Sequence, residues 1–175
     1  MLCEAELYAN IKDTYGVSYG GNQDEKDDGI DVKVNIAKES EICGFIPKRN
    51  TIFQVKKPTM PPAKVKEEMT NKDGSVKKCI ETLSENNGAY IIASSGDDLT
   101  EVTYNSRIRA MKEILDASGI SNITVEFYDS NRIATWTRKY PSLICWVNDK
   151  NKKIRMGGHR IVIGQIEALK NKNLL

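Results

Sequence analysis

Two short segments of the chain carry side chains that together can hold a divalent cation and activate a water molecule. Asp31 follows Gly29 and Ile30, and 23 positions later Gln54-Val55-Lys56 adds an amide oxygen and an ammonium group. Mg²⁺ takes oxygen ligands and keeps several waters, so Asp31, the Gln54 side chain and the Val55 backbone carbonyl can supply the protein ligands. Lys56 would then orient or help deprotonate a metal-bound water and offset charge growing on a phosphate. This set of groups predicts metal-assisted phosphodiester hydrolysis.

Both segments are predicted to be strands, the first by alternating apolar and polar residues and the second by a run at residues 51–56 that ends before Pro58. Residues 30–36 alternate strictly, which places Asp31 on the face opposite to Ile30 and Val32. In the strand predicted over residues 51–56, Gln54 and Lys56 share one face. The three groups converge on one cation only when the two strands are neighbours, and the prediction depends on that pairing.

These motifs resemble the D…(D/E)xK signature of the restriction endonuclease-like superfamily, in the QxK version typical of Mrr-type nucleases. The resemblance implies a three-layer α/β core with a mixed sheet between helices, and cleavage of double-stranded DNA with Mg²⁺ or Mn²⁺. It also implies a third acidic ligand from the first helix, for which Glu4 fits best and Glu6 is the reserve choice. Glutamine in place of the usual acid leaves one fewer negative charge on the metal, so the third acid matters more.

The run from residues 90–95 through Arg107 and Met111, and especially residues 127–136, is similar to Mrr-like nuclease domains at the N-termini of large bacterial antiphage NTPases. The resemblance implies an effector of antiphage defence. We expect the 175 residues to be one nuclease domain whose sensor and oligomerisation parts are missing, so that cutting would require a homo-oligomer.

Helical and strand patterns alternate along the rest of the chain, which favours a layered α/β domain with a mixed sheet. A catalytic core is expected over about residues 1–128 and a basic helical part over about 129–175. Residues 60–73 are the best candidate for a mobile loop. Helices are predicted over 2–13, from Ser75 to about 86, over 101–117, from Ser130 to Tyr140 and around 161–172, and strands over 17–19, 30–36, 51–56, 89–93 and 123–128.

The charge of the chain is unevenly distributed. The 26 basic and 24 acidic residues give +2 overall, but residues 1–50 carry six against ten (−4), residues 51–130 ten against twelve (−2), and residues 131–175 ten against two (+8). A basic surface attracts phosphate backbones, although a solvated face that keeps the protein soluble is an equally open interpretation. Trp136 is expected to be a core anchor. The candidate DNA contacts are Lys57, Arg107, Arg132, Arg138, Lys139 and Lys152.

Several classes of protein are disfavoured. The four cysteines are widely separated and there is one histidine, which argues against a zinc site and for reduced thiols in a cytoplasmic protein. The apolar runs stop far short of the roughly 20 residues that span a bilayer, so a membrane or secreted protein is not expected. Two alternatives to the nuclease stay open: a catalytically silent nucleic-acid-binding module, and an interaction domain whose basic tail binds an acidic protein.

Overall fold

The computed structural model describes residues 1–12, 16–20, 30–37 and 44–156, without the side chains of 151–156. The chain divides into two compact units, residues 1–136 and 137–175. The first unit contains all five strands of the sheet. In the second unit, the described part contains the helix α6 (Pro141–Met156).

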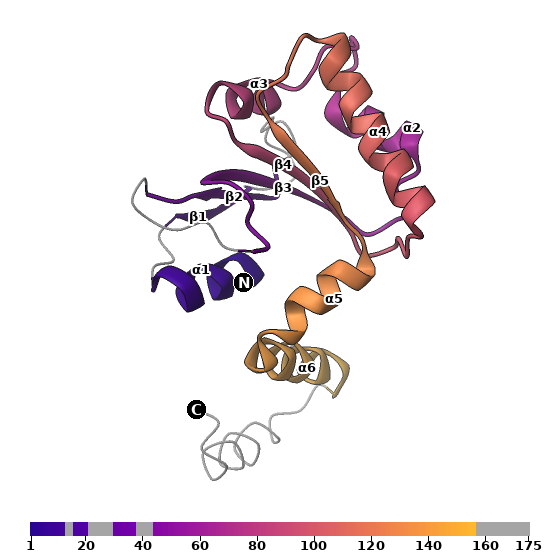
Figure 1. Cartoon of the computed structure of the whole chain (residues 1–175). Coiled ribbons are helices and arrows are strands. Elements are labelled where there is room, and N and C mark those ends of the chain that lie inside the picture. The colour runs from indigo at the N-terminus through magenta and orange to yellow at the C-terminus, as the bar shows by residue number, and fades with distance from the viewer. Residues whose placement is uncertain (13–15, 21–29, 38–43, 157–175) are drawn as a thin grey trace. The chain divides into compact units, whose positions relative to one another are not determined.

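The first unit is built on a five-stranded mixed sheet in the order β1-β2-β3-β4-β5 (Figure 1). β2 is antiparallel to β1 and β3, whereas β4 is parallel to both β3 and β5. The predicted pairing of the two motif strands is therefore confirmed. The strands are β1 (Val17–Tyr19), β2 (Val32–Asn35), β3 (Asn50–Lys56), β4 (Ala89–Ser94) and β5 (Thr124–Tyr128).

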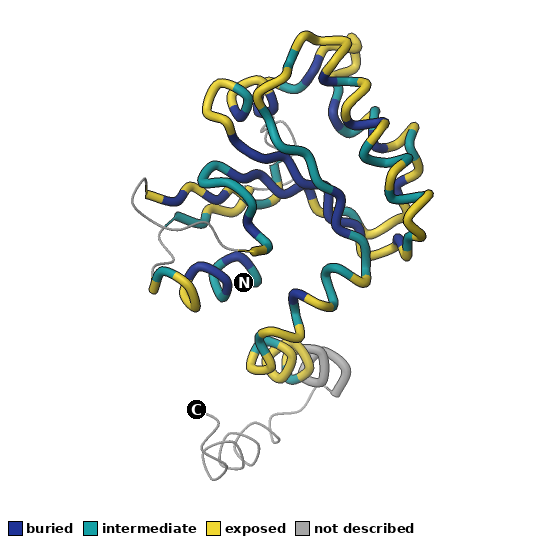
Figure 2. The backbone as a smooth tube through the Cα atoms, in the orientation of Figure 1, coloured by how far each residue is buried: buried dark blue, intermediate teal, exposed yellow. Residues whose placement is uncertain are grey.

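Helices flank the two faces of this sheet, which confirms a layered α/β arrangement (Figure 1). The face that carries Ile52, Tyr90 and Ile92 packs against α2 (Pro62–Met69), α3 (Lys78–Glu85) and α4 (Glu101–Ala117) in one large apolar core. We call it the α3 face. Every residue of β4 is buried, as Figure 2 shows, because this strand is covered on both sides.

The opposite face, which we call the α1 face, packs against α1 (Leu2–Ile11) and the start of α5 (Ser130–Arg138). Trp136 is 3% exposed and lies between Phe45 and Phe53, with ring centroids 5.3 and 5.7 Å away. The expected role of Trp136 as a core anchor is confirmed.

The expectation of a loop over residues 60–73 is wrong. Residues 62–69 form α2, which begins with Pro62 in its first turn and buries Val65 and Met69, four residues apart. Proline is well suited to that position because its missing N–H has no partner in a first turn anyway. Ser75 caps no helix either: it forms a turn with Asp73, and α3 begins at Lys78.

The remaining predicted boundaries agree with the structure to within a few residues, whereas α6 over residues 141–156 was not predicted. The helix over residues 101–117 is confirmed at both ends, and Gly119 follows it in the left-handed conformation. The helix around 161–172 lies outside the described residues. Within the described ranges, no helix has both the length and the apolar composition needed to cross a membrane.

Candidate active site

Asp31 lies just before β2 and reaches the end of β3. Val32 pairs with Phe53, so Asp31 sits at the level of Gln54. Its Oδ2 accepts a hydrogen bond of 2.7 Å from the backbone N–H of Val55. Since the N–H and C=O of a strand residue point to the same side, the Val55 carbonyl is also directed toward the Asp31 side of β3. The acid and the backbone carbonyl named from the sequence are therefore neighbours.

Gln54 is buried, with 4% of its surface exposed, on the α3 face of the sheet. Its side-chain oxygen Oε1 has no hydrogen-bond partner in the described part of the chain. A buried amide oxygen without a partner typically costs about 1–3 kcal/mol, and such groups are rare in folded proteins. The oxygen that the sequence assigns to a cation is therefore buried and without a partner in the described part of the chain.

Lys56 lies on the same face and is held by a residue that the sequence analysis missed. Its Nζ is 2.8 Å from Oε2 of Glu68, and the other oxygen of Glu68 is 3.0 Å from Nζ of Lys77. All three side chains are at most one-quarter exposed. Glu68 was missed because it lies in α2, the helix mistaken for a loop. The signal that could have found it is the i, i+4 pair Val65 and Met69 after a proline.

Tyr90 is the second missed residue. It lies on β4, where it pairs with Ile52 while Gln54 pairs with Ile92, so Tyr90 and Gln54 are diagonal neighbours on one face. Its hydroxyl is buried and, like Gln54 Oε1, has no partner among the residues described. Burial raises the pKa of Tyr90 well above its ordinary value, and negative charge on Cys79, Glu68 and Asp31 acts in the same direction. The phenol thus lies within electrostatic range of both carboxylates of the site.

The structure does not bring the first-helix acids to this cluster. Glu6 is fully buried, and its Oε2 accepts a 2.7 Å hydrogen bond from Nε1 of Trp136 on the α1 face. Glu4 is 2.8 Å from the N-terminal ammonium group, and hydrogen bonds from that group and then from Tyr19 lower the pKa of Glu4. No described contact links either acid to Asp31, Gln54 or Lys56. The carboxylate brought to Lys56 is that of Glu68.

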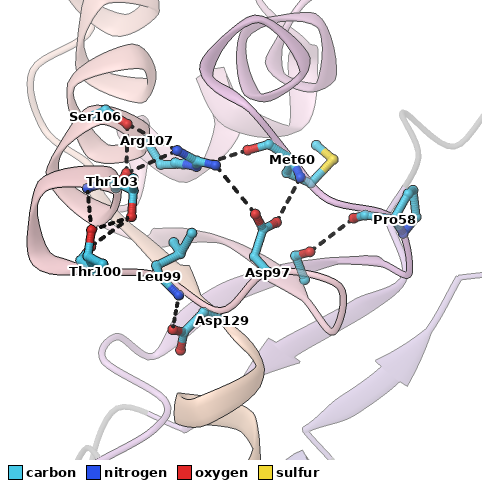
Figure 3. A network of polar contacts seen from close by, with 10 residues as sticks. Pro58, Met60, Asp97, Leu99, Thr100, Thr103, Ser106, Arg107 and Asp129 are labelled. Atoms are coloured by element: carbon cyan, nitrogen blue, oxygen red, sulfur yellow. Dashed lines mark hydrogen bonds and ion pairs between the residues drawn. The ribbon is translucent and has the colours of Figure 1, made fainter.

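Arg107, a candidate for contacting DNA, has an internal role in this structure (Figure 3). It is 13% exposed; its Nε donates to the carbonyl of Met60, and its Nη2 lies 3.4 Å from Oδ1 of Asp97. Asp97, at 3% exposure, also accepts a 2.7 Å bond from the N–H of Met60. These contacts join the segment after β3 to the segment after β4, so Arg107 supports the chain that follows Lys56.

The other candidate DNA contacts lie in several environments. Lys57 is exposed directly beside Lys56, and Arg138 and Lys139 are exposed near the end of α5. Arg132 is 3.2 Å from Glu126 and lies over the ring of Tyr128 at 4.2 Å, so part of its charge is already paired. The side chain of Lys152 lies outside the described residues.

The donor set fits a hard cation through oxygen atoms alone. Asp31 supplies a carboxylate, Gln54 an unpartnered amide oxygen and Val55 a backbone carbonyl, which are the ligand types that Mg²⁺ accepts alongside water. In the described ranges, no group of three or more histidine, cysteine and acidic side chains is placed to hold a metal. Any cation at this site would therefore depend on the amide and the backbone as much as on acids.

Comparison of the chain with protein-family models, with curated proteins and with solved structures finds no match.

Proposed function

We propose that the chain is a metal-dependent endonuclease domain that hydrolyses phosphodiester bonds in DNA. The observation that carries the proposal is the buried, unpartnered Oε1 of Gln54, set at the level of Asp31 and on one face with Lys56. If this position had only a structural role, we would expect the oxygen to accept a hydrogen bond or the glutamine to be an apolar residue. The basic C-terminal part and the resemblance to Mrr-type nucleases support DNA as the substrate.

In this mechanism Asp31, Gln54 and the Val55 carbonyl would hold Mg²⁺ or Mn²⁺, which supplies a Lewis acid and lowers the pKa of a bound water. Lys56 orients the attacking water and offsets negative charge on the phosphate, and Glu68 positions the Lys56 ammonium group. Water adds to phosphorus, the bond from phosphorus to the leaving oxygen breaks, and one water proton is released while the other is transferred to the leaving oxygen. The resemblance further places this activity in bacterial antiphage defence.

The test is cleavage of supercoiled plasmid with Mg²⁺ or Mn²⁺ by the full chain and by variants. Asp31→Ala and Lys56→Ala should each lower the rate about 100-fold or more, the usual scale for losing a group that acts on the attacking water. Lys72→Ala, which removes an exposed lysine remote in sequence from the motifs, is the control and should cleave like the wild type. If the folded wild type makes no nicks in the plasmid with either metal, the proposed nuclease activity is refuted.

One alternative, a nucleic-acid-binding module without activity, is favoured by a specific observation. Lys56 is paired with Glu68, and glutamine replaces an acid at the site. If the chain is a silent module, the wild type and the Asp31→Ala variant should bind DNA with the same salt dependence, and neither protein should cut it. Equal DNA binding together with metal-dependent cutting by the wild type alone separates the nuclease from the module.

A further inference from the structure

A hollow lies on the α3 face, near the proposed catalytic cluster along β3. Its volume is about 620 Å³, within the usual range for small-molecule sites. Strands β2 and β3 form one wall and α3 forms the other. The lining residues are Ile30, Lys33, Asn35, Asn50, Ile52, Lys78, Cys79, Thr82, Leu83 and Asn86.

The hollow combines positive charge with amide groups and an apolar floor. The ammonium groups of Lys33 and Lys78, one on each wall, form no ion pair or hydrogen bond with a described residue and are exposed. Ile52 and Leu83 are buried at 3% and 4% exposure and form the floor. Three asparagines add hydrogen-bond donors and acceptors at the rim. A ligand that matches all three features has an anionic group, a flat apolar surface and a polar edge.

The position of the hollow relates it to the catalytic cluster. Lys33 pairs with Ile52, two residues along β3 from Gln54, and the side chains of these three residues lie on the α3 face. Two strand residues span about 7 Å. A nucleotide in the hollow would therefore be close along the strand to a phosphate held at Gln54.

We propose that this hollow binds one unpaired nucleotide of the DNA strand, next to the phosphate to be cut. The phosphate would contact Lys33 and Lys78, the base would lie on Ile52 and Leu83, and the asparagines would contact its edge. A base within a duplex cannot enter such a hollow without leaving its stack, so single-stranded, frayed or distorted DNA is the inferred substrate. The inference deepens the proposed nuclease function and depends on it for the substrate, but not for the binding itself.

The binding test uses the full chain in EDTA, so that no cleavage takes part. Calorimetry with the four deoxynucleoside monophosphates, and fluorescence anisotropy with a single-stranded and a duplex oligonucleotide, measure the affinities. Lys33→Glu/Lys78→Glu should weaken nucleotide and single-strand binding about tenfold or more, because two charge-assisted contacts are lost. Thr82→Trp, at an exposed position of α3 that lines the hollow, should block binding without changing charge.

The charge-matched control is Lys72→Glu/Lys112→Glu, which changes two exposed lysines outside the lining by the same amount. Monophosphate binding that the control retains and both hollow variants lose supports a site that also takes free nucleotides. If the hollow variants lose binding of the single-stranded oligonucleotide alone, the site binds a nucleotide only as part of a DNA strand. Failure of both probes to bind, or equal binding by all variants, overturns the inference. Binding as expected, without metal-dependent cleavage of either the plasmid or the single-stranded oligonucleotide by the wild type, would refute the nuclease and leave the nucleotide site standing.

Discussion

The side-chain oxygen of Gln54 is expected to lower the stability of the fold and to be required for the proposed activity. Replacing it with methionine removes the unpartnered Oε1 while keeping a similar volume, so the free energy of unfolding should rise by about 1 kcal/mol. The same change should abolish metal-dependent cleavage. Urea unfolding and plasmid nicking on one preparation measure both quantities. A methionine variant that is less stable than the wild type would mean that Oε1 has a partner in solution.

The matched variant Gln54→Glu should make stability depend on metal. A buried carboxylate costs free energy unless a cation or hydrogen bond compensates it, so the variant should melt below the wild type in EDTA. It should gain more from Mn²⁺ than the wild type does, since a ligand that binds only the folded state stabilises it. An equal response of both proteins to Mn²⁺ would argue against a cation at this position.

Tyr90 gives a prediction about alkaline pH. Burial raises its pKa in the folded state, so an unfolded chain ionises this phenol first, and its contribution to stability is present below about pH 10 and lost as pH rises further. The Tyr90→Phe variant has no phenol to ionise, so it does not lose stability in this way at alkaline pH. It also has no unpartnered hydroxyl. The variant should be more stable by about 1 kcal/mol at pH 8, and the difference should widen at pH 10.5. Urea unfolding at both pH values checks it; a constant difference would contradict it.

At the scale of elements, the loop that follows β4 packs closely against the segment that follows Lys56. A side chain at Gly96 would lie 2.4 Å from the carbonyl oxygen of Lys57 and 2.9 Å from the carbonyl carbon of Pro58. Gly96→Ala must therefore push the two loops apart, which should cost about 1–3 kcal/mol of stability and lower cleavage in proportion to the displacement of Lys56. Gly44→Ala, where an added Cβ meets nothing within 4 Å, should be neutral. Equal melting temperatures for both variants would contradict the proposed coupling.

At the scale of the whole molecule, the basic C-terminal part is expected to supply salt-sensitive DNA affinity. Lys139→Glu/Lys150→Glu reverses two exposed charges of the second unit. If each lysine meets a phosphate, the slope of log affinity against log salt should become shallower by roughly 0.9 per contact. Anisotropy titrations from low to physiological salt measure the slope. An unchanged slope would show that this surface only keeps the protein soluble.

The sequence by itself determined the local features of this protein, which are its strands, the faces of their side chains and the distribution of charge. Alternation within residues 30–36 and the run at 51–56 ended by Pro58 predicted two strands. A shared face for Gln54 and Lys56 followed, because side-chain direction in a strand depends only on its own backbone. The pairing of these strands, confirmed in the structure, then placed Asp31 beside Val55. The uneven charge along the chain is likewise a property of the sequence alone.

The tertiary structure alone decided which other groups join the site. Glu6 and Glu68 are the same type of residue, yet α1 packs on the α1 face and buries its acid against Trp136, whereas α2 packs on the other face and brings its acid to Lys56. Likewise, the basic residue Arg107 contacts Asp97 inside the fold. Which face a helix covers depends on the burial of apolar surface contributed by distant segments, and a local pattern of residues does not contain that information.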